Sequence, residues 1–146
     1  MAEGTVQTIE SSASPQRLFD VALAIDSYPQ WVTGVKEVDV LERDDEDRPV
    51  RARMVVDAGV RVIDYVLRYT YDPEYLQFSW DAEPGEDIKS LSGYYEFAEL
   101  DDGGTEVRYG LRVEPAFPFP GFLRRQAEKH IITNALRGLK RRAEET

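Results

Sequence analysis

The sequence predicts an α+β fold in which one long C-terminal helix packs on a curved antiparallel sheet. Two observations lead to this prediction. From Val50 to Val113, large apolar or aromatic residues recur at every second position, as on the buried face of strands. After Pro120-Gly121, apolar residues recur at helical spacing over about five turns, with basic residues between them. This apolar stripe consists of Leu123, Ala127, Ile131, Ala135 and Leu139, widened by Ile132 and Leu136. One helix is narrower than several curved strands, so we expect a space between them that aromatic side chains line.

The N-terminal region predicts a strand followed by two short helices. Residues 5–10 alternate weakly, as in a first or edge strand. Ser14 is a suitable N-cap, and Pro15 suits the first helical position, so a helix is expected to begin there. Residues 26–31 predict a second short helix, with Asp26 or Ser27 available as its cap.

The next region predicts six antiparallel strands. The first covers residues 35–42 and ends in an acidic turn, and the second begins at Val50. Turns separate the later strands at Ala58-Gly59, Asp72-Pro73, Pro84-Gly85 and residues 101–104. The residues expected on the inner face are Met54, Tyr65, Leu67, Tyr69, Tyr71, Leu76, Phe78, Trp80, Leu91, Tyr95, Phe97, Val107, Tyr109, Leu111 and Val113.

Composition narrows the class of protein. The 146 residues, 42% of them hydrophobic, are enough for one domain spanning 1–146 with its own core. There is no cysteine and one histidine, so we expect no disulfide, no metal site and no cofactor. A formal net charge of −10 disfavours nucleic acid as a partner. The chain starts without an apolar signal segment and has no run long enough to span a bilayer, which favours a cytoplasmic protein.

Two segments are candidate contact surfaces. Residues 115–122 carry three phenylalanines and three prolines; the phenylalanines are expected to be buried, to lie at a pocket mouth, or to touch a membrane or partner. The last helix has a basic face that includes Arg124, Arg125, Lys129 and Arg137. That face is either a solvated surface or a docking surface for a membrane or an acidic partner. The sequence leaves the oligomeric state open.

The element order, together with several short segments, resembles the START-like (birch-pollen-allergen-like, SRPBCC) superfamily, and most nearly its polyketide cyclase/dehydrase and coenzyme Q-binding branch. The segments that carry the resemblance are Ser14-Pro15 with residues 18–21, Tyr28-Pro29-Gln30-Trp31, residues 89–95, residues 104–107 and residues 135–140. The resemblance implies a helix-grip fold, in which a seven-stranded sheet grips the last helix around a cavity. Members carry lipids, quinones, hormones or polyketide intermediates, and a minority catalyse cyclisation or dehydration.

Glu128 is the one weak candidate for a catalytic group. Helical geometry places it near the centre of the apolar stripe, one turn after Arg124. It is expected either to pair with Arg124 at the rim of the core or to point into the cavity as a polar anchor. His130 lies nearly opposite the stripe, so we expect it to face solvent or to bond locally. Trp31 is expected to plug the space beneath the second helix rather than to act as a lid.

The leading hypothesis is a carrier or binding module for a small hydrophobic molecule, such as a lipid, a quinone or an aromatic polyketide. The residues expected to contact this ligand are Met54, Tyr65, Leu67, Tyr69, Phe78, Trp80, Tyr95, Phe97, Tyr109, Phe119, Phe122 and Glu128. The alternative is a polyketide aromatase/cyclase/dehydrase, which needs positioned acid–base groups. A protein-interaction module is a third possibility.

Overall fold

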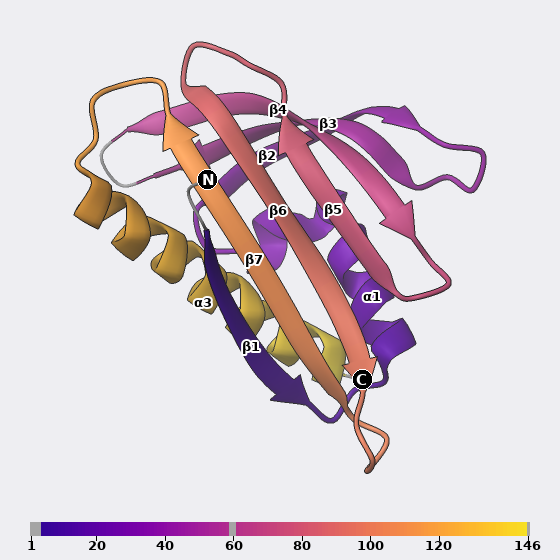
Figure 1. Ribbon diagram of the computed structural model, residues 1–146. Helices are drawn as coiled ribbons and strands as arrows, with labels where there is room; N and C mark the ends of the chain where they lie inside the picture. The colour runs from indigo at the N-terminus through magenta and orange to yellow at the C-terminus, as the bar shows by residue number, and fades with distance from the viewer. Residues whose placement is uncertain (1–3, 59–60, 146) are drawn as a thin grey trace.

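The computed structural model describes residues 4–58 and 61–145, and within them seven strands and three α-helices follow the expected order (Figure 1). The elements are β1 (Thr5–Ser11), α1 (Pro15–Leu23), the 3-10 turn η1 (Ile25–Ser27), α2 (Tyr28–Trp31), β2 (Val35–Arg43), β3 (Pro49–Asp57), β4 (Val62–Asp72), β5 (Gln77–Ala82), β6 (Ile88–Glu99), β7 (Thr105–Pro115) and α3 (Gly121–Glu144). The predicted fold class is therefore confirmed: a curved antiparallel sheet grips a long C-terminal helix.

The strands form one antiparallel sheet in the order β1-β7-β6-β5-β4-β3-β2. Because β1 and β2 occupy opposite edges, the connection through α1, η1 and α2 carries the chain from one edge to the other (Figure 1). Helix α3 lies against β1 and β7, and α1 packs on α3. One face of the sheet is thus covered by helices, and this face holds the core.

The predicted alternation along the strands is confirmed by the register. Trp80 on β5 lies opposite Tyr69 on β4 and Gly93 on β6, and Tyr95 on β6 lies opposite Tyr109 on β7. Packing requires a glycine at position 93, because a Cβ atom there would lie 2.5 Å from the Trp80 indole. The missing side chain lets the indole lie flat over β6.

Helix α1 begins as predicted. The Ser14 side chain accepts a hydrogen bond from the Arg17 N–H at 3.2 Å, and Pro15 occupies the first turn. Phe19 meets Phe78 and Phe97 edge to face, with ring centroids 5.9 and 6.1 Å apart. These contacts fix α1 on the inner face of β5 and β6.

The predicted cap of the second helix is wrong. The Ser27 side chain forms no capping hydrogen bond, and Asp26 instead forms an ion pair with Arg43 at 3.6 Å. The reason is local: α2 continues directly from the turn η1, so no extended residue precedes it to act as a cap.

The two parts of α3, residues 121–131 and 132–144, which we call its first and second halves, differ in burial. The second half supplies Ile132, Ala135, Leu136, Gly138 and Leu139 to the core, as predicted except for the glycine. In the first half, Leu123 and Ile131 were expected on the same buried stripe but are 37% and 40% exposed. The prediction fails there because α1 and α2 reach only the far half, where Arg17 Nε donates to the Ala143 carbonyl at 3.3 Å.

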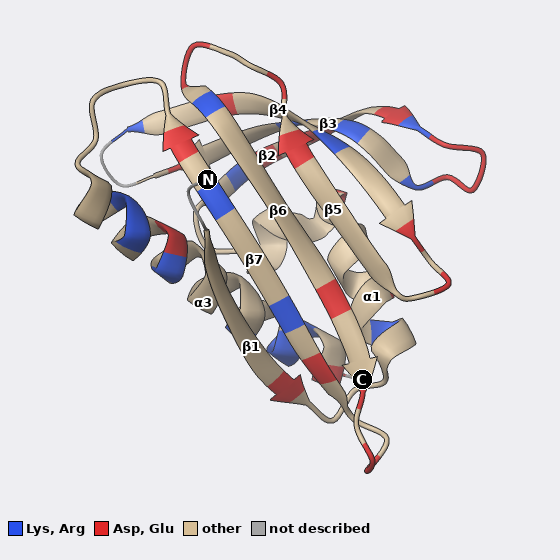
Figure 2. Ribbon diagram, viewed as in Figure 1, with Lys and Arg blue, Asp and Glu red and all other residues tan. Residues whose placement is uncertain are grey.

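Charge is distributed unevenly over these elements. Lys and Arg side chains mark the first turns of α3, whereas acidic side chains mark several turns between strands (Figure 2). Among the described residues, no helix is long and apolar enough to cross a membrane.

Candidate ligand-binding cavity

A cavity of about 560 Å³ lies between the sheet and the first half of α3. This volume is in the range of small-molecule sites in proteins. Its walls come from β3 to β7, from α3, and from the connections that precede β2 and α3. The space between sheet and helix that the sequence predicts is therefore present.

Eight of the twelve residues predicted to contact a ligand line this cavity. They are Met54, Tyr65, Leu67, Tyr69, Trp80, Tyr95, Tyr109 and Phe119. The other four, Phe78, Phe97, Phe122 and Glu128, lie outside the lining. Phe78 and Phe97 are on the predicted face, but Phe19 of α1 covers them.

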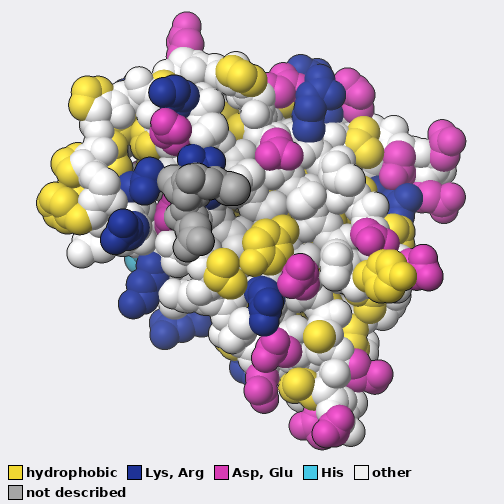
Figure 3. Space-filling view, viewed as in Figure 1, with side chains coloured by type: hydrophobic (Ala, Val, Ile, Leu, Met, Phe, Trp, Pro, Cys, Tyr) yellow, Lys and Arg dark blue, Asp and Glu magenta, His cyan; other side chains and the backbone are white. Residues whose placement is uncertain are grey.

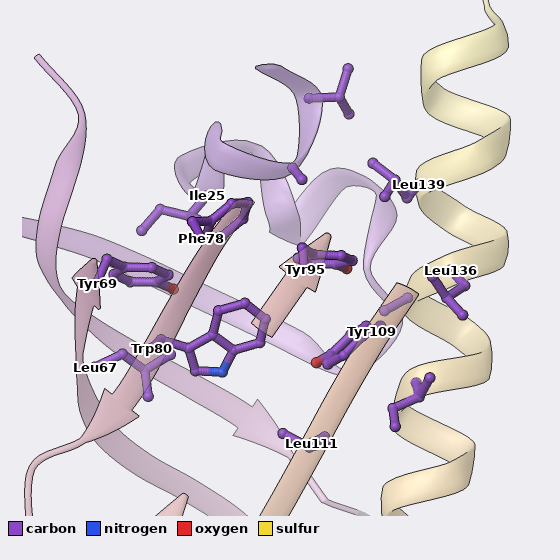
Figure 4. Close-up of a cluster of buried hydrophobic side chains, with 14 of the residues drawn as sticks. Ile25, Leu67, Tyr69, Phe78, Trp80, Tyr95, Tyr109, Leu111, Leu136 and Leu139 are labelled. Atoms are coloured by element: carbon purple, nitrogen blue, oxygen red, sulfur yellow. The ribbon is translucent and has the colours of Figure 1, made fainter. Parts of the chain in front are cut away.

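An aromatic cluster forms the inner wall (Figure 4). The Trp80 indole lies 5.6 Å from the rings of both Tyr95 and Tyr109, and those two rings are 4.6 Å apart. Tyr69 extends the cluster, with its ring 6.1 Å from Trp80. Rigid rings at these separations give a wall with few rotatable bonds, which keeps the cavity open at low entropic cost.

Four tyrosine hydroxyls add polarity to this wall. Within the described residues, the hydroxyls of Tyr65, Tyr69, Tyr95 and Tyr109 form no hydrogen bond. Burial raises the pKa of each of these four phenols well above its ordinary value. They therefore remain protonated at neutral pH and are free to donate a hydrogen bond to a bound molecule.

Two further tyrosines already have partners. The Tyr28 hydroxyl donates to the Ala22 carbonyl, and the Tyr71 hydroxyl donates to the Pro49 carbonyl at 2.5 Å. Tyr28 lines the cavity with its ring, whereas Tyr71 lies outside it. Trp31 is buried, and its ring and carbonyl face Gly138 of α3, which is the plug position that the sequence predicts.

Glu128 is 2% exposed and serves a structural role. One carboxylate oxygen accepts from Thr5 Oγ1 at 2.9 Å and the other from the Val113 N–H at 2.7 Å. The expected ion pair with Arg124 is absent from the described part of the protein, so that expectation is wrong. Glu128 instead ties α3 to β1 and β7.

One row of residues on α3 faces the cavity, and the predicted apolar stripe contains its three apolar members, Ala127, Ile131 and Ala135, but not its polar ones. Arg124, Ala127, His130, Ile131, Asn134 and Ala135 line the cavity. Their spacing of three and four residues is the signal of a common helical face. His130 is exposed and its Nε2 lies 3.1 Å from the Asn134 amide nitrogen, as expected for a locally bonded residue, yet it also borders the cavity.

The phenylalanine-rich connection lies at the same end of the protein. Phe117 and Phe119 line the cavity, and the Arg61 guanidinium lies 4.6 Å from the centre of the Phe117 ring. Phe122 is 67% exposed. The space-filling view shows hydrophobic side chains beside Lys and Arg at the end of the molecule where α3 begins (Figure 3).

The cavity offers little for a metal or a prosthetic group. Among the described residues, no three His, Cys, Asp or Glu side chains lie close enough together to hold a metal ion. The titratable groups in the lining other than tyrosine are Asp57, Arg124 and His130. The arrangement is suited to enclosing an apolar molecule and to giving it a few hydrogen bonds.

The sequence matches the family model described as "Polyketide cyclase / dehydrase and lipid transport" over residues 11–140. The chain therefore belongs to this family, as the resemblance predicted. No curated protein matches the sequence.

Solved structures with the same fold include a START superfamily protein from Mycobacterium smegmatis, with a TM-score of 0.88, 21% identity and 98% of each chain covered. A protein from Thermus thermophilus aligns with a TM-score of 0.81 and 22% identity over 96% of each chain. The Zhui aromatase/cyclase from a Streptomyces species aligns with a TM-score of 0.78 and 15% identity, covering 97% of this chain and 93% of that one. At these identities the likeness establishes the fold.

Proposed function

We propose that this protein binds and carries a small hydrophobic molecule in the cavity between its sheet and α3. The observation that carries the proposal is the cavity itself, about 560 Å³ in volume and walled by aromatic side chains with four unbonded hydroxyls. Burial of an apolar molecule there supplies affinity at about 25 cal/mol per Å² of apolar surface removed from water. The hydroxyls orient the molecule. The contact residues of this proposal are the eight predicted residues that line the cavity.

Binding of the neutral dye Nile red to the purified protein tests the proposal. We expect its emission to rise on binding, and the emission of Trp80, in the cavity wall, to change with it. Ala127→Trp places an indole on the cavity-facing row and is expected to abolish binding. The matched control is Lys129→Trp, an exposed position on the same helix outside the lining, which should leave binding intact. Equal binding by both variants would contradict the proposal.

Native mass spectrometry of the same preparation gives an independent test. We expect a bound molecule that organic solvent extracts and that Ala127→Trp excludes. The mass of that molecule would distinguish a lipid, a quinone and an aromatic polyketide.

An aromatase/cyclase activity is the second candidate, and His130 is the observation that favours it. His130 borders the cavity, and histidine is the side chain that most often transfers protons in enzymes. The four buried phenols argue against strong base catalysis, because their raised pKa values keep them protonated. Turnover of a model poly-β-ketone that His130→Gln abolishes without weakening binding would establish the enzyme; binding without turnover would support the carrier.

A further inference from the structure

Arg124 is a cation in a mostly apolar cavity, and it has no counter-ion in the described part of the protein. Its Nε atom is buried and forms no hydrogen bond, and its guanidinium forms no ion pair. A guanidinium stays charged at any physiological pH. Arg124 is half-buried, and its Nε is shielded from water without a hydrogen-bond partner, which is unfavourable for a polar group.

The carboxylate that helical spacing would give to Arg124 is already engaged. Glu128, one turn further along α3, accepts from Thr5 Oγ1 and from the Val113 N–H. Both of its oxygens are therefore directed towards β1 and β7. Arg124 therefore brings to the cavity a positive charge that the neighbouring carboxylate of its own helix does not pair with.

Arg112 has a buried and unpartnered Nε like that of Arg124, but the two arginines differ in whether they line the cavity. Arg112 also has a buried Nε without a hydrogen-bond partner, but it lies on β7 between the inward-facing Leu111 and Val113 and is not part of the lining. Arg124, by contrast, shares its row on α3 with the apolar residues Ala127 and Ile131. An anion bound by Arg124 would thus lie next to a wall suited to an alkyl or aryl body.

His130 and Asn134 continue the row. The Asn134 amide nitrogen lies 3.1 Å from Nε2 of His130, and both residues belong to the same lining as Arg124. Both side chains carry N–H groups that can donate to a bound anion. A carboxylate has the acceptor oxygens that such donors require, and arginine binds it through two parallel hydrogen bonds.

We propose that the ligand is an amphiphile with a carboxylate, which pairs with Arg124 while the apolar body occupies the cavity. This inference rests on the proposed binding function and adds the chemical class of the ligand. The polar end of the ligand lies at the start of α3, and its apolar end extends towards the aromatic cluster around Trp80.

The test compares two ligands that differ only in the head group, dodecanoic acid and dodecan-1-ol, by their displacement of Nile red. We expect the wild-type protein to prefer the acid by about tenfold or more, the size of one charge-assisted hydrogen bond. Arg124→Gln should remove this preference while keeping affinity for the alcohol. The matched control is Arg125→Gln, an exposed neighbour outside the lining, which should retain the preference.

The outcomes separate the two proposals. Equal affinity of the wild-type protein for acid and alcohol, or a preference that survives in Arg124→Gln, would overturn the carboxylate inference and leave the carrier function standing. Failure of the acid, the alcohol and Nile red to bind would overturn both. The Arg124 side chain forms no hydrogen bond or ion pair within the described residues, so Arg124→Gln is expected to fold with an unchanged or higher melting temperature. Should it fail to fold, the preference of the wild-type protein alone decides.

Discussion

The two halves of α3 are parts of one continuous α-helix, but one half is packed in the core and the other borders the cavity. The second half packs Ile132, Leu136 and Leu139 into the core, where α1 and Trp31 lie against it. The first half has Glu128 as its one buried residue among those described, and its apolar residues border the cavity or solvent. The same helix is therefore core at one end and cavity wall at the other.

In each half of α3, a glutamate carboxylate accepts a hydrogen bond from a hydroxyl group of β1, and this bond holds the helix to the sheet. Glu128 accepts from Thr5 at the start of β1, and Glu144 accepts from Ser11 at its end at 2.6 Å. Between them Thr133 donates to the side chain of Gln7 at 2.8 Å. Hydrogen bonds to β1, and not side-chain packing, thus keep the first half of α3 in place. For this reason an open cavity can persist beside a folded core.

The largest expected effect separates two adjacent isoleucines. Ile132→Ala, at a site that is 0% exposed, should lower the free energy of unfolding by about 2–5 kcal/mol, because it leaves a hole in the core. Ile131→Ala, at a 40% exposed site, should lower it by less than about 0.5 kcal/mol but weaken ligand binding. Urea unfolding and Nile red titration measure the two quantities. Similar stability losses in both variants would mean that the halves are not different.

Glu128→Gln tests the hydrogen bonds that join the first half of α3 to Thr5 and Val113. An amide offers one acceptor oxygen where the carboxylate offers two, so the Thr5 hydroxyl has to turn and accept from the amide NH2 group, and both charge-assisted hydrogen bonds become weaker neutral ones. We expect a loss of about 1–3 kcal/mol in the free energy of unfolding. Hydrogen exchange should rise most in the first half of α3, with the exposed Glu145→Gln as control. Unchanged exchange there would show that packing, and not these hydrogen bonds, holds the helix.

Gly138→Ala tests the close packing of the second half. A Cβ atom at this position would lie 2.8 Å from the Trp31 carbonyl oxygen and 3.0 Å from its ring. Overpacking costs about 1–3 kcal/mol, and the better helix propensity of alanine offsets about 1 kcal/mol of this. The net loss should be about 1 kcal/mol by thermal unfolding. Gly121→Ala, with nothing within 4 Å of its Cβ, is the control. A more stable Gly138→Ala protein would contradict the packing argument.

The smallest expected effect concerns the hydrogen bond between Ser11 and Glu144, at the C-terminal end of α3. The hydrogen bond from Ser11, followed by that from Lys140, lowers the pKa of Glu144 from 4.5 to about 2. Since the folded-state pKa is depressed, Glu144 stabilises the protein above pH 4.5, and this stability is lost as the pH falls towards 2. Ser11→Ala should therefore lower the melting temperature at pH 7 by more than it does near pH 2.5. A difference that does not change with pH would contradict this role.

The sequence was sufficient to predict the strands, their inward faces and the cavity, because a period of two depends only on local geometry. It did not distinguish Phe78 and Phe97 from Tyr95 and Trp80, which share their faces. That distinction depends on where Phe19 meets the sheet, a contact between distant segments. Periodicity fixes a face but not the position along the strand at which a helix covers it.

The residues on α3 show the same limit. The apolar spacing that continues through Leu123 and Ile131 predicted burial along the whole helix, but in the described part of the protein α1 and α2 meet α3 at Ala143 and Gly138, in the second half. Glu128 was correctly placed facing inward, yet its partners are Thr5 and a backbone N–H of β7, which helical spacing cannot indicate. Helical spacing therefore predicted Arg124 as the partner of Glu128, whereas in the fold the Glu128 carboxylate is directed towards β1 and β7.

Gly93 helps to set the volume of the cavity, although it does not line it. Since the Trp80 indole rests where a side chain at position 93 would stand, any larger residue there would push the ring out into the cavity. A single change on β6 would thereby shrink the space available to a ligand without altering any residue that lines it. The volume of the cavity is thus set in part by a residue that does not line it.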